Sequence, residues 1–126
     1  MTRLLSLVPI ALLLFPVSLK AECDAEAGRR QFNKCVACHS VESGIQMMGP
    51  SLYDLFGRKV GSVEGFTFSV AMEEADVVWT DQTLSEFLGK PMTFIPGSVM
   101  PFGGIKKPEQ RKALICYLKQ FSDESQ

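Results

Sequence analysis

Apolar residues in this chain recur every three or four positions, which is the period of an α-helix. Asp24 can cap a first helix that extends to about Lys34, because its side chain can accept hydrogen bonds from free backbone N–H groups. Pro108 suits the first position of a last helix. The apolar residues of this last helix have the spacing i, i+3, i+4, i+7: Leu114, Tyr117, Leu118 and Phe121. The pattern therefore predicts a helix near each end of the chain.

Glycine and proline interrupt the middle of the chain and leave room only for short helices. We expect such helices at residues 51–56, 69–76 and 82–88, and an ordered loop at residues 92–107. Thr80 or Asp81 can cap the helix at 82–88, and Gly89 and Pro91 end it. No stretch shows the sustained alternation of apolar and polar residues that is typical of a strand. The predicted fold class is all-α with long loops.

The N-terminal segment resembles a secretory signal peptide. Arg3 supplies a positive charge, residues 4–15 form a largely apolar run, and Ala21 is a suitable cleavage point. The run is too short for a membrane span, and the residues before Cys23 fit a lipid-anchor signal badly. We therefore expect a signal peptide at residues 1–21, a single domain at residues 22–126, export to the periplasm and no stable membrane anchor.

The charge balance argues against one class of partner. Cleavage after Ala21 would leave 105 residues with 11 basic and 14 acidic side chains, a formal charge of −3. Nucleic-acid binding depends on concentrated positive charge, so we expect no nucleic-acid partner. A chain of this length can bury only a modest core, which a bound prosthetic group would extend.

The strongest chemical signal is the pentapeptide Cys35-Val36-Ala37-Cys38-His39, which contains the only histidine of the chain. The pattern C-x-x-C-H is the attachment signature of c-type haem. Two thiols three residues apart on one helical turn can each add to a vinyl group of the porphyrin. The adjacent imidazole then lies under the iron as its axial ligand. The motif therefore predicts a covalently bound haem c.

The motif has three other interpretations. A thioredoxin-like redox pair needs a strand before the motif and has no use for the histidine. A structural zinc site needs four ligands, but Cys23 and Cys116 are isolated in the sequence and there is no second histidine. A disulfide between Cys35 and Cys38 is the simplest alternative to haem attachment.

An iron bound only by His39 would keep one axial position open. No other histidine can fill it, so a methionine thioether is the natural candidate. The methionines of the 22–126 segment are Met47, Met48, Met72, Met92 and Met100. Met100 stands out because Pro96-Gly97 before it and Pro101 after it form a stiff turn, which could hold the thioether at a fixed distance from the iron.

From Gly28 to the last helix, the sequence resembles a class I soluble cytochrome c of the mitochondrial and small bacterial type. The matching stretches cover nearly all of the 22–126 segment in order: CVACHSVE, GPSLYDLFGRKVG, GFTF, VVWTDQTLSEFL, FIPGSVMPFGGIKK and ALICYLK. The resemblance implies several helices with long loops wrapped around one covalently bound haem. It also implies that Cys35 and Cys38 anchor the haem and that His39 and Met100 are its axial ligands.

Four further residues gain a role through this resemblance. The Pro50 carbonyl is expected to accept a hydrogen bond from the His39 ring, and Ser98 occupies the place of a threonine whose hydroxyl lies near the haem. Arg58 and Trp79 are expected to approach a haem propionate, the first with a charged donor fork and the second with an indole N–H. The alternatives are a solvated charge at Arg58 and a core aromatic at Trp79.

Two residues depart from the family in a way that makes the haem pocket more apolar. Phe68 occupies a position that is commonly tyrosine, and Met72 a position that is commonly asparagine. Neither side chain can donate a hydrogen bond. Because an apolar pocket disfavours the ferric cation, we expect both residues to raise the reduction potential.

The exposed haem edge is expected to differ from the family as well. Where family members carry lysines that steer them onto acidic partners, this chain has Ile45, Met47, Met92 and Val99, and it retains Lys34, Lys106 and Lys107. Such an edge predicts docking through apolar contact, with weaker orientation by the lysines. Alternatively, some of these apolar side chains fold inward and cover the haem.

The cysteines outside the motif are not part of the family pattern. The resemblance implies that the first and last helices pack together, with Gly28 at their crossing, and Cys23 and Cys116 belong to this region. In an oxidising compartment these two thiols can pair. A Cys23–Cys116 disulfide would close a loop of about 90 residues and would add roughly 3–5 kcal/mol to stability.

With both axial positions filled, the iron would bind no substrate, so we expect a monomeric one-electron carrier and not an enzyme. The expected partners are redox proteins, namely a dehydrogenase, a respiratory complex or a terminal oxidase. The alternative is a haem enzyme of the peroxidase type, in which Met100 is displaced from the iron.

Overall fold

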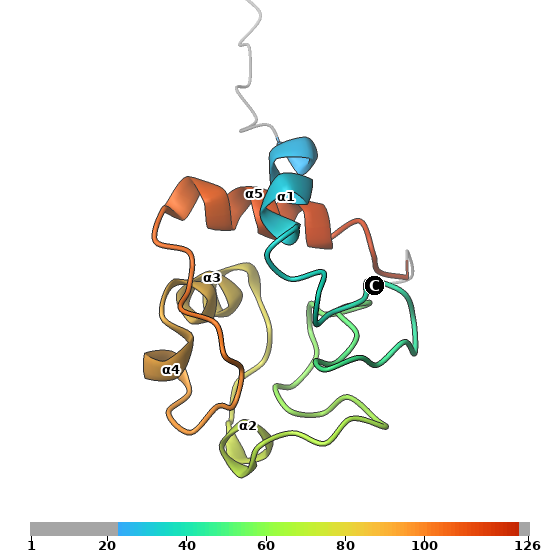
Figure 1. Cartoon of the computed structure of the whole chain (residues 1–126), viewed down its shortest axis with the longest axis vertical. Coiled ribbons are helices and arrows are strands. Elements are labelled where there is room, and N and C mark those ends of the chain that lie inside the picture. Colours follow the sequence, from blue (N-terminus) through green and yellow to red (C-terminus); the bar gives the residue numbers. More distant parts are fainter. Residues whose placement is uncertain (1–22, 124–126) are drawn as a thin grey trace, which may run out of the picture.

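A computed structural model describes residues 23–123 of the 126-residue chain. Its helices are α1 (Ala25–Phe32), α2 (Val70–Glu74), α3 (Asp81–Gly89), α4 (Pro91–Phe94) and α5 (Pro108–Leu118) (Figure 1). The strand-like pairing among the described residues amounts to one bridge between Lys59 and Val78. The all-α fold class is therefore confirmed. The signal peptide expected at residues 1–21 lies outside the described part of the chain.

Capping side chains define where the helices begin. The Asp24 carboxylate accepts a hydrogen bond from the Ala27 backbone N–H at 2.8 Å. Thr80 and Thr83 cap the start of α3 reciprocally, and Pro108 occupies the first turn of α5. These starting points agree with the sequence analysis. Helices α1, α2 and α5 are each a few residues shorter than the helices that the sequence predicts at these places.

The prediction of a helix at residues 51–56 was wrong. The backbone N–H of Leu52 donates to the Ser40 carbonyl at 2.9 Å, and that of Asp54 donates to the Phe121 carbonyl at 2.7 Å. Asp54 also has a φ of 54°, which lies outside the right-handed helical region. Hydrogen bonds to distant segments therefore replace the helical ones here.

Helix α4 overlaps the start of residues 92–107, which the sequence predicts as an ordered loop. Pro91 occupies its first turn, and the backbone N–H of Ile95 donates to the Pro91 carbonyl at 3.1 Å. Proline suits this position because it needs no partner for an N–H and its φ is already helical. The residue that was expected only to end the preceding helix thus also starts the next one.

Helix α1 crosses α5 at one end of the molecule (Figure 1). Gly28 lies at the crossing, and a Cβ atom added there would overlap the Ala113 carbonyl oxygen and lie 2.6 Å from the Tyr117 Cβ. Phe32 extends the contact, because its ring centroid lies 5.5 Å from that of Tyr117. The expected packing of the two terminal helices around Gly28 is confirmed.

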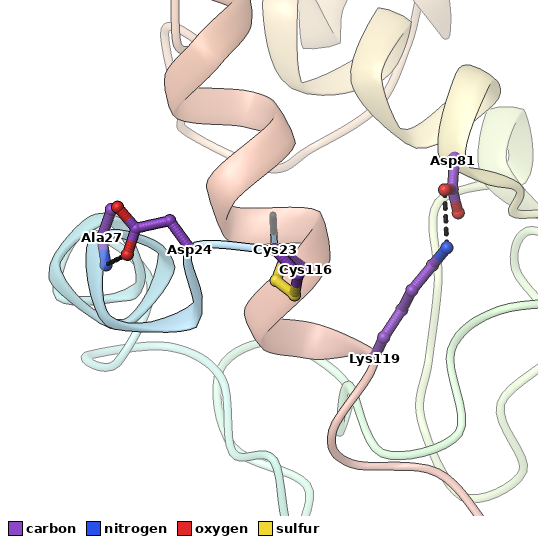
Figure 2. The surroundings of a disulfide bond; sticks show 6 residues. All are labelled: Cys23, Asp24, Ala27, Asp81, Cys116 and Lys119. Atoms are coloured by element: carbon purple, nitrogen blue, oxygen red, sulfur yellow. Dashed lines mark hydrogen bonds and ion pairs between the residues drawn. A yellow bond between two sulfur atoms is a disulfide. The ribbon is translucent and has the colours of Figure 1, made fainter. Parts of the chain in front are cut away.

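Cys23 and Cys116 meet as a disulfide pair that joins the segment before α1 to α5 (Figure 2). Their Cα atoms lie 5.6 Å apart, within the usual range for disulfides. Just after α5, the Lys119 ammonium pairs with the Asp81 carboxylate of α3 at 2.6 Å (Figure 2). The first pair connects α5, and the second the residue after it, to neighbouring segments.

The buried core gathers side chains from α1, α3, α5 and the connecting segments: Phe32, Leu55, Val60, Trp79, Leu84, Phe87, Leu88, Ile95, Ile105, Leu114, Ile115 and Leu118. Figure 1 shows that the long segment between α1 and α2 lies across the molecule from α3 and α4. Within residues 23–123, no helix is both long enough and apolar enough to cross a membrane.

Candidate functional site

A cavity of about 370 Å³ is lined by side chains from the segment after α1, from α3, from residues 98–102 and from α5. Most of its wall is apolar, and it includes Phe68, Met72 and Phe87. Protein interiors contain few voids larger than one water molecule. A cavity of this size in a domain of about 100 residues is therefore expected to bind a large apolar group.

The motif residues Cys35, Cys38 and His39 all line this cavity. The turn that carries them continues α1, because the Cys35 N–H donates to the Phe32 carbonyl at 2.8 Å and the His39 N–H donates to the Cys35 carbonyl at 2.9 Å. Both motif cysteines are free thiols and do not pair with each other. Burial raises the pKa of the Cys35 thiol. The structure thus presents two thiols and an imidazole to one apolar space.

The His39 imidazole is fixed in orientation. Its Nδ1 lies 2.7 Å from the Pro50 carbonyl oxygen, as the family resemblance implies. Since a carbonyl can only accept, Nδ1 carries the proton and donates it, which leaves the Nε2 lone pair available to a metal. Burial lowers the pKa of His39 and so favours this neutral form. Gly49 packs against the ring so closely that a Cβ atom there would overlap it.

Three of the five candidate methionines line the cavity: Met48, Met72 and Met100. The other two, Met47 and Met92, lie outside its lining. Met100 follows a turn in which Gly97 has a φ of 91° and the Ser98 N–H donates to the Ile95 carbonyl at 3.1 Å. The stiff turn inferred from the sequence is therefore present beside the cavity.

Polar groups are few in the cavity wall, and three of them belong to predicted site residues. Arg58 is partly buried and donates to the carbonyls of Ser51 and Tyr53, each at 3.2 Å. Burial lowers the pKa of its guanidinium, which nevertheless stays charged at neutral pH. Trp79 and Ser98 are both buried and line the cavity as well.

Exposed side chains mark the mouth of the cavity, which we define as Lys34, Met48, Val99 and Pro101. Of the residues expected at an apolar edge, Val99 is 76% exposed and lies at this mouth, while Ile45, Met47 and Met92 are at least 45% exposed and lie outside the lining. All four side chains are thus exposed, and among them only Val99 borders the cavity, where it could cover a bound haem. Lys106 and Lys107 are exposed but do not line the cavity.

Sequence reasoning missed three contributors to the site. Gly49 is one of the glycines in the middle of the chain that the sequence assigns only to loops, but the structure shows that it lets the backbone approach the imidazole. Met48 reaches the cavity mouth, whereas the neighbouring Met47 does not. Phe87 lines the cavity from α3, and its helical spacing alone could not separate it from ordinary core. Residues 23–123 contain no group of three or more His, Cys, Asp or Glu placed to hold a metal ion.

Two thiols, an imidazole with a free Nε2 and a thioether thus face one apolar cavity, a set of groups that fits a covalently attached haem. Fold and site together define a small all-α haem protein. The model of the cytochrome c family matches residues 25–122. The chain belongs to the cytochrome c family, in its class I branch.

Its relatives include cytochrome c2 iso-2 of Magnetospirillum molischianum, 47% identical over 96 residues that cover 76% of this chain and 96% of that protein. Cytochrome c of Ginkgo biloba is 42% identical over 103 residues, covering 80% and 91%. Among solved structures, cytochrome cH from Methylobacterium extorquens superimposes with a TM-score of 0.73 at 36% identity, covering 77% of this chain and 98% of that one. The protein is therefore a haem-based electron carrier whose cofactor is covalently bound haem c.

Proposed function

We propose that the chain carries one electron at a time on a single haem, which Cys35 and Cys38 hold through thioether bonds and His39 and Met100 bind as axial ligands. The observation that carries this proposal is that all four side chains line the same apolar cavity, although Met100 lies far from the motif in sequence. When bound, the haem would supply an iron that can alternate between the ferrous and ferric states. The soft, neutral thioether of Met100 favours the ferrous state and so raises the potential.

In this proposal, the other site residues orient the axial ligand and bind the haem propionates. Pro50 fixes the His39 ring through Nδ1, so that Nε2 would be free to bind the iron. The Arg58 guanidinium and the Trp79 indole N–H supply donors for the haem propionates. Ser98 accepts from the Met100 N–H at 3.5 Å, so its own hydroxyl proton is available to a propionate.

The attachment of haem is tested by the mass and colour of the purified protein. A red protein heavier than its polypeptide by one haem is expected, and Cys35→Ala and Cys38→Ala should each remove one thioether. A colourless product of polypeptide mass would contradict haem attachment. A haem protein that turns over peroxide and lacks a thioether–iron signature would support the peroxidase-type alternative.

We further propose that the carrier docks its redox partner at the cavity mouth through apolar contact. Met48, Val99 and Pro101 are exposed there, and Lys34 is the one exposed charge of the described lining. This chemistry fits a partner protein with an apolar patch and a carboxylate opposite Lys34. A dehydrogenase, a respiratory complex or a terminal oxidase is the expected class of partner.

Charge insertion tests this docking surface. A partner isolated from periplasm or membranes under native redox conditions is mixed with the carrier in stopped flow. Val99→Lys and Met48→Lys are expected to slow electron transfer, whereas Val70→Lys, at a site 66% exposed and outside the lining, should not. Wild-type transfer should depend weakly on ionic strength, and a steep fall with added salt would contradict apolar docking.

The proposed location is the periplasm, to which residues 1–21 would direct the chain before they are cleaved off. Export into an oxidising compartment would allow Cys23 and Cys116, whose Cα atoms lie 5.6 Å apart, to form a disulfide. N-terminal sequencing of the mature protein tests the cleavage. Alkylation with and without reductant tests the bond, and two thiols that react freely without reductant would contradict it.

A further inference from the structure

The segment that carries Met100 runs between two deeply buried residues. Ile95 is 4% exposed and Ile105 is 2% exposed, whereas Pro96, Val99 and Pro101 between them are exposed. Figure 1 shows this segment leaving α4 and passing α3 on its way to α5. We call residues 95–105 the ligand loop. Between these ends Ser98 is also buried, and Met100 and Phe102 pack against the core, but both ends are fixed by hydrogen bonds to neighbouring elements.

The first end of the ligand loop is fixed by helical structure. Ile95 directly follows α4, whose Pro91 is among the most deeply buried residues of the described chain. The Ile95 N–H donates to the Pro91 carbonyl at 3.1 Å. This end thus continues the packed α3–α4 unit.

The second end docks on the C-terminal end of α3 through backbone contact. The Ile105 N–H donates to the Leu88 carbonyl at 2.7 Å. Gly104 has a φ of 100°, and a Cβ atom there would lie 2.6 Å from the Gly89 carbonyl oxygen. This end of the loop is not part of a helix, so its position depends on the groups that contact Ile105.

Arg111 of α5 supplies that support. Its Nη1 donates to the carbonyls of Ile105 at 2.8 Å and Lys106 at 2.9 Å, and its Nε donates to the Ser85 hydroxyl at 3.1 Å. One partly buried guanidinium therefore ties together α5, α3 and the end of the ligand loop. Hydrogen bonds from a charged donor are stronger than those between neutral groups, and the fork geometry fixes direction as well. Among residues 23–123, Arg111 takes part in no ion pair, so these donors serve the loop.

We propose that Arg111 is a positioning residue for Met100: it holds the far end of the ligand loop and so keeps the thioether at the iron. The proposal rests on Met100 being an axial ligand. Release of Met100 requires the loop to move away from the cavity, and that movement is opposed at the second end by the Arg111 hydrogen bonds. Loss of these bonds should therefore favour release of Met100 without affecting the bond between His39 and the iron.

Competition by imidazole for the ferric iron measures loop opening directly, because imidazole can bind only where Met100 has left. Arg111→Met keeps much of the side-chain length but removes every donor. We expect its apparent affinity for imidazole to rise about tenfold, since a loss of hydrogen bonds to a charged donor shifts the opening equilibrium by about this factor. Arg111→Lys, which keeps the charge but not the fork, should show a smaller rise.

Two controls separate positioning from a general loss of stability. Val60→Ala removes fully buried atoms outside the ligand loop and outside the cavity lining, so it should lower the unfolding midpoint without changing imidazole affinity. Lys112→Met removes an exposed charge from the same helix and should change neither quantity.

Unchanged imidazole affinity in Arg111→Met, or an equal rise in Val60→Ala, would overturn the positioning role. If Arg111→Met does not yield folded holoprotein, Arg111→Lys and Ser85→Ala replace it in the test. If imidazole affinity rises in neither variant, the positioning role is also overturned. A wild-type protein without a thioether–iron signature would instead refute Met100 ligation, so the two failures can be told apart.

Discussion

The two proposed iron ligands are held by different means. His39 lies on a turn that continues α1, and α1 is fixed to α5 by the crossing at Gly28 and by the Cys23–Cys116 pair. Its ring is fixed a second time by the Pro50 carbonyl. Met100 lies on the ligand loop, a non-helical segment with several exposed residues, whose second end is held by side chains and backbone from other helices.

This difference indicates where the site is rigid and where it can open. The His39 side has several attachments that act together, so the loss of one should lower global stability and leave the imidazole in place. The Met100 side has few attachments, so small changes there should alter ligation before they alter stability. The predictions below test this contrast.

Removal of the Cys23–Cys116 pair is expected to have the largest effect. Because it would cross-link residues separated by 93 positions, the Cys23→Ala/Cys116→Ala variant should lose about 4 kcal/mol of unfolding free energy. Urea denaturation of the holoprotein measures this loss, and chemically reduced wild type is the matched control. Imidazole affinity should stay unchanged. A loss below about 1 kcal/mol would show that the pair contributes little.

Substitution of Gly28 by alanine should have the next largest effect. The added Cβ would overlap the Ala113 carbonyl and force α1 away from α5, at a cost of about 2–3 kcal/mol. Gly103→Ala is the control, because no atom lies within 4 Å of a Cβ added there. Urea denaturation of both variants measures the difference. Equal stability of the two would contradict a tight crossing at Gly28.

Polar replacements in the cavity wall should change potential more than stability. Met72→Asn and Phe68→Tyr introduce donors into the apolar lining and are each expected to lower the midpoint potential by about 30–60 mV, which corresponds to about 1 kcal/mol for one electron. Phe121→Tyr adds the same hydroxyl outside the lining and should change nothing. Potentials that stay constant or rise in both cavity variants would refute a role for the apolar wall.

The ion pair between Asp81 and Lys119 should contribute least to the free energy of unfolding. Both side chains are about half exposed, at 61% and 49%, so solvent screens their interaction. Asp81→Asn is expected to cost about 0.5 kcal/mol or less, and a double-mutant cycle with Lys119→Met isolates the pair. A coupling free energy above about 1 kcal/mol would place this link among the main attachments of α5.

The sequence was most informative where structure is local. The thiols and the imidazole lie within five residues, the caps at Asp24 and Thr80 act within one turn, and all of these lie as expected. The contact between His39 and Pro50 was also anticipated, but only through the family resemblance. A short motif needs little information from the rest of the chain.

Features that depend on distant contacts could not be predicted. Residues 51–56 contain apolar residues at helical spacing, yet their N–H groups bond to Ser40 and Phe121. Whether the edge side chains fold inward also depends on packing, as does the role of Arg111, which sequence analysis did not single out. In each case a residue from another part of the chain decides the outcome.

Spectroscopy of the ferric protein tests Met100 ligation most directly. A bond between a thioether and ferric iron gives a weak charge-transfer band in the far red, and wild type, Met48→Ala and Met72→Ala are all expected to retain it. Met100→Ala should lose the band while remaining red, because Cys35, Cys38 and His39 still hold the haem. Retention of the band in Met100→Ala, or its loss in Met72→Ala alone, would contradict the proposed ligand pair.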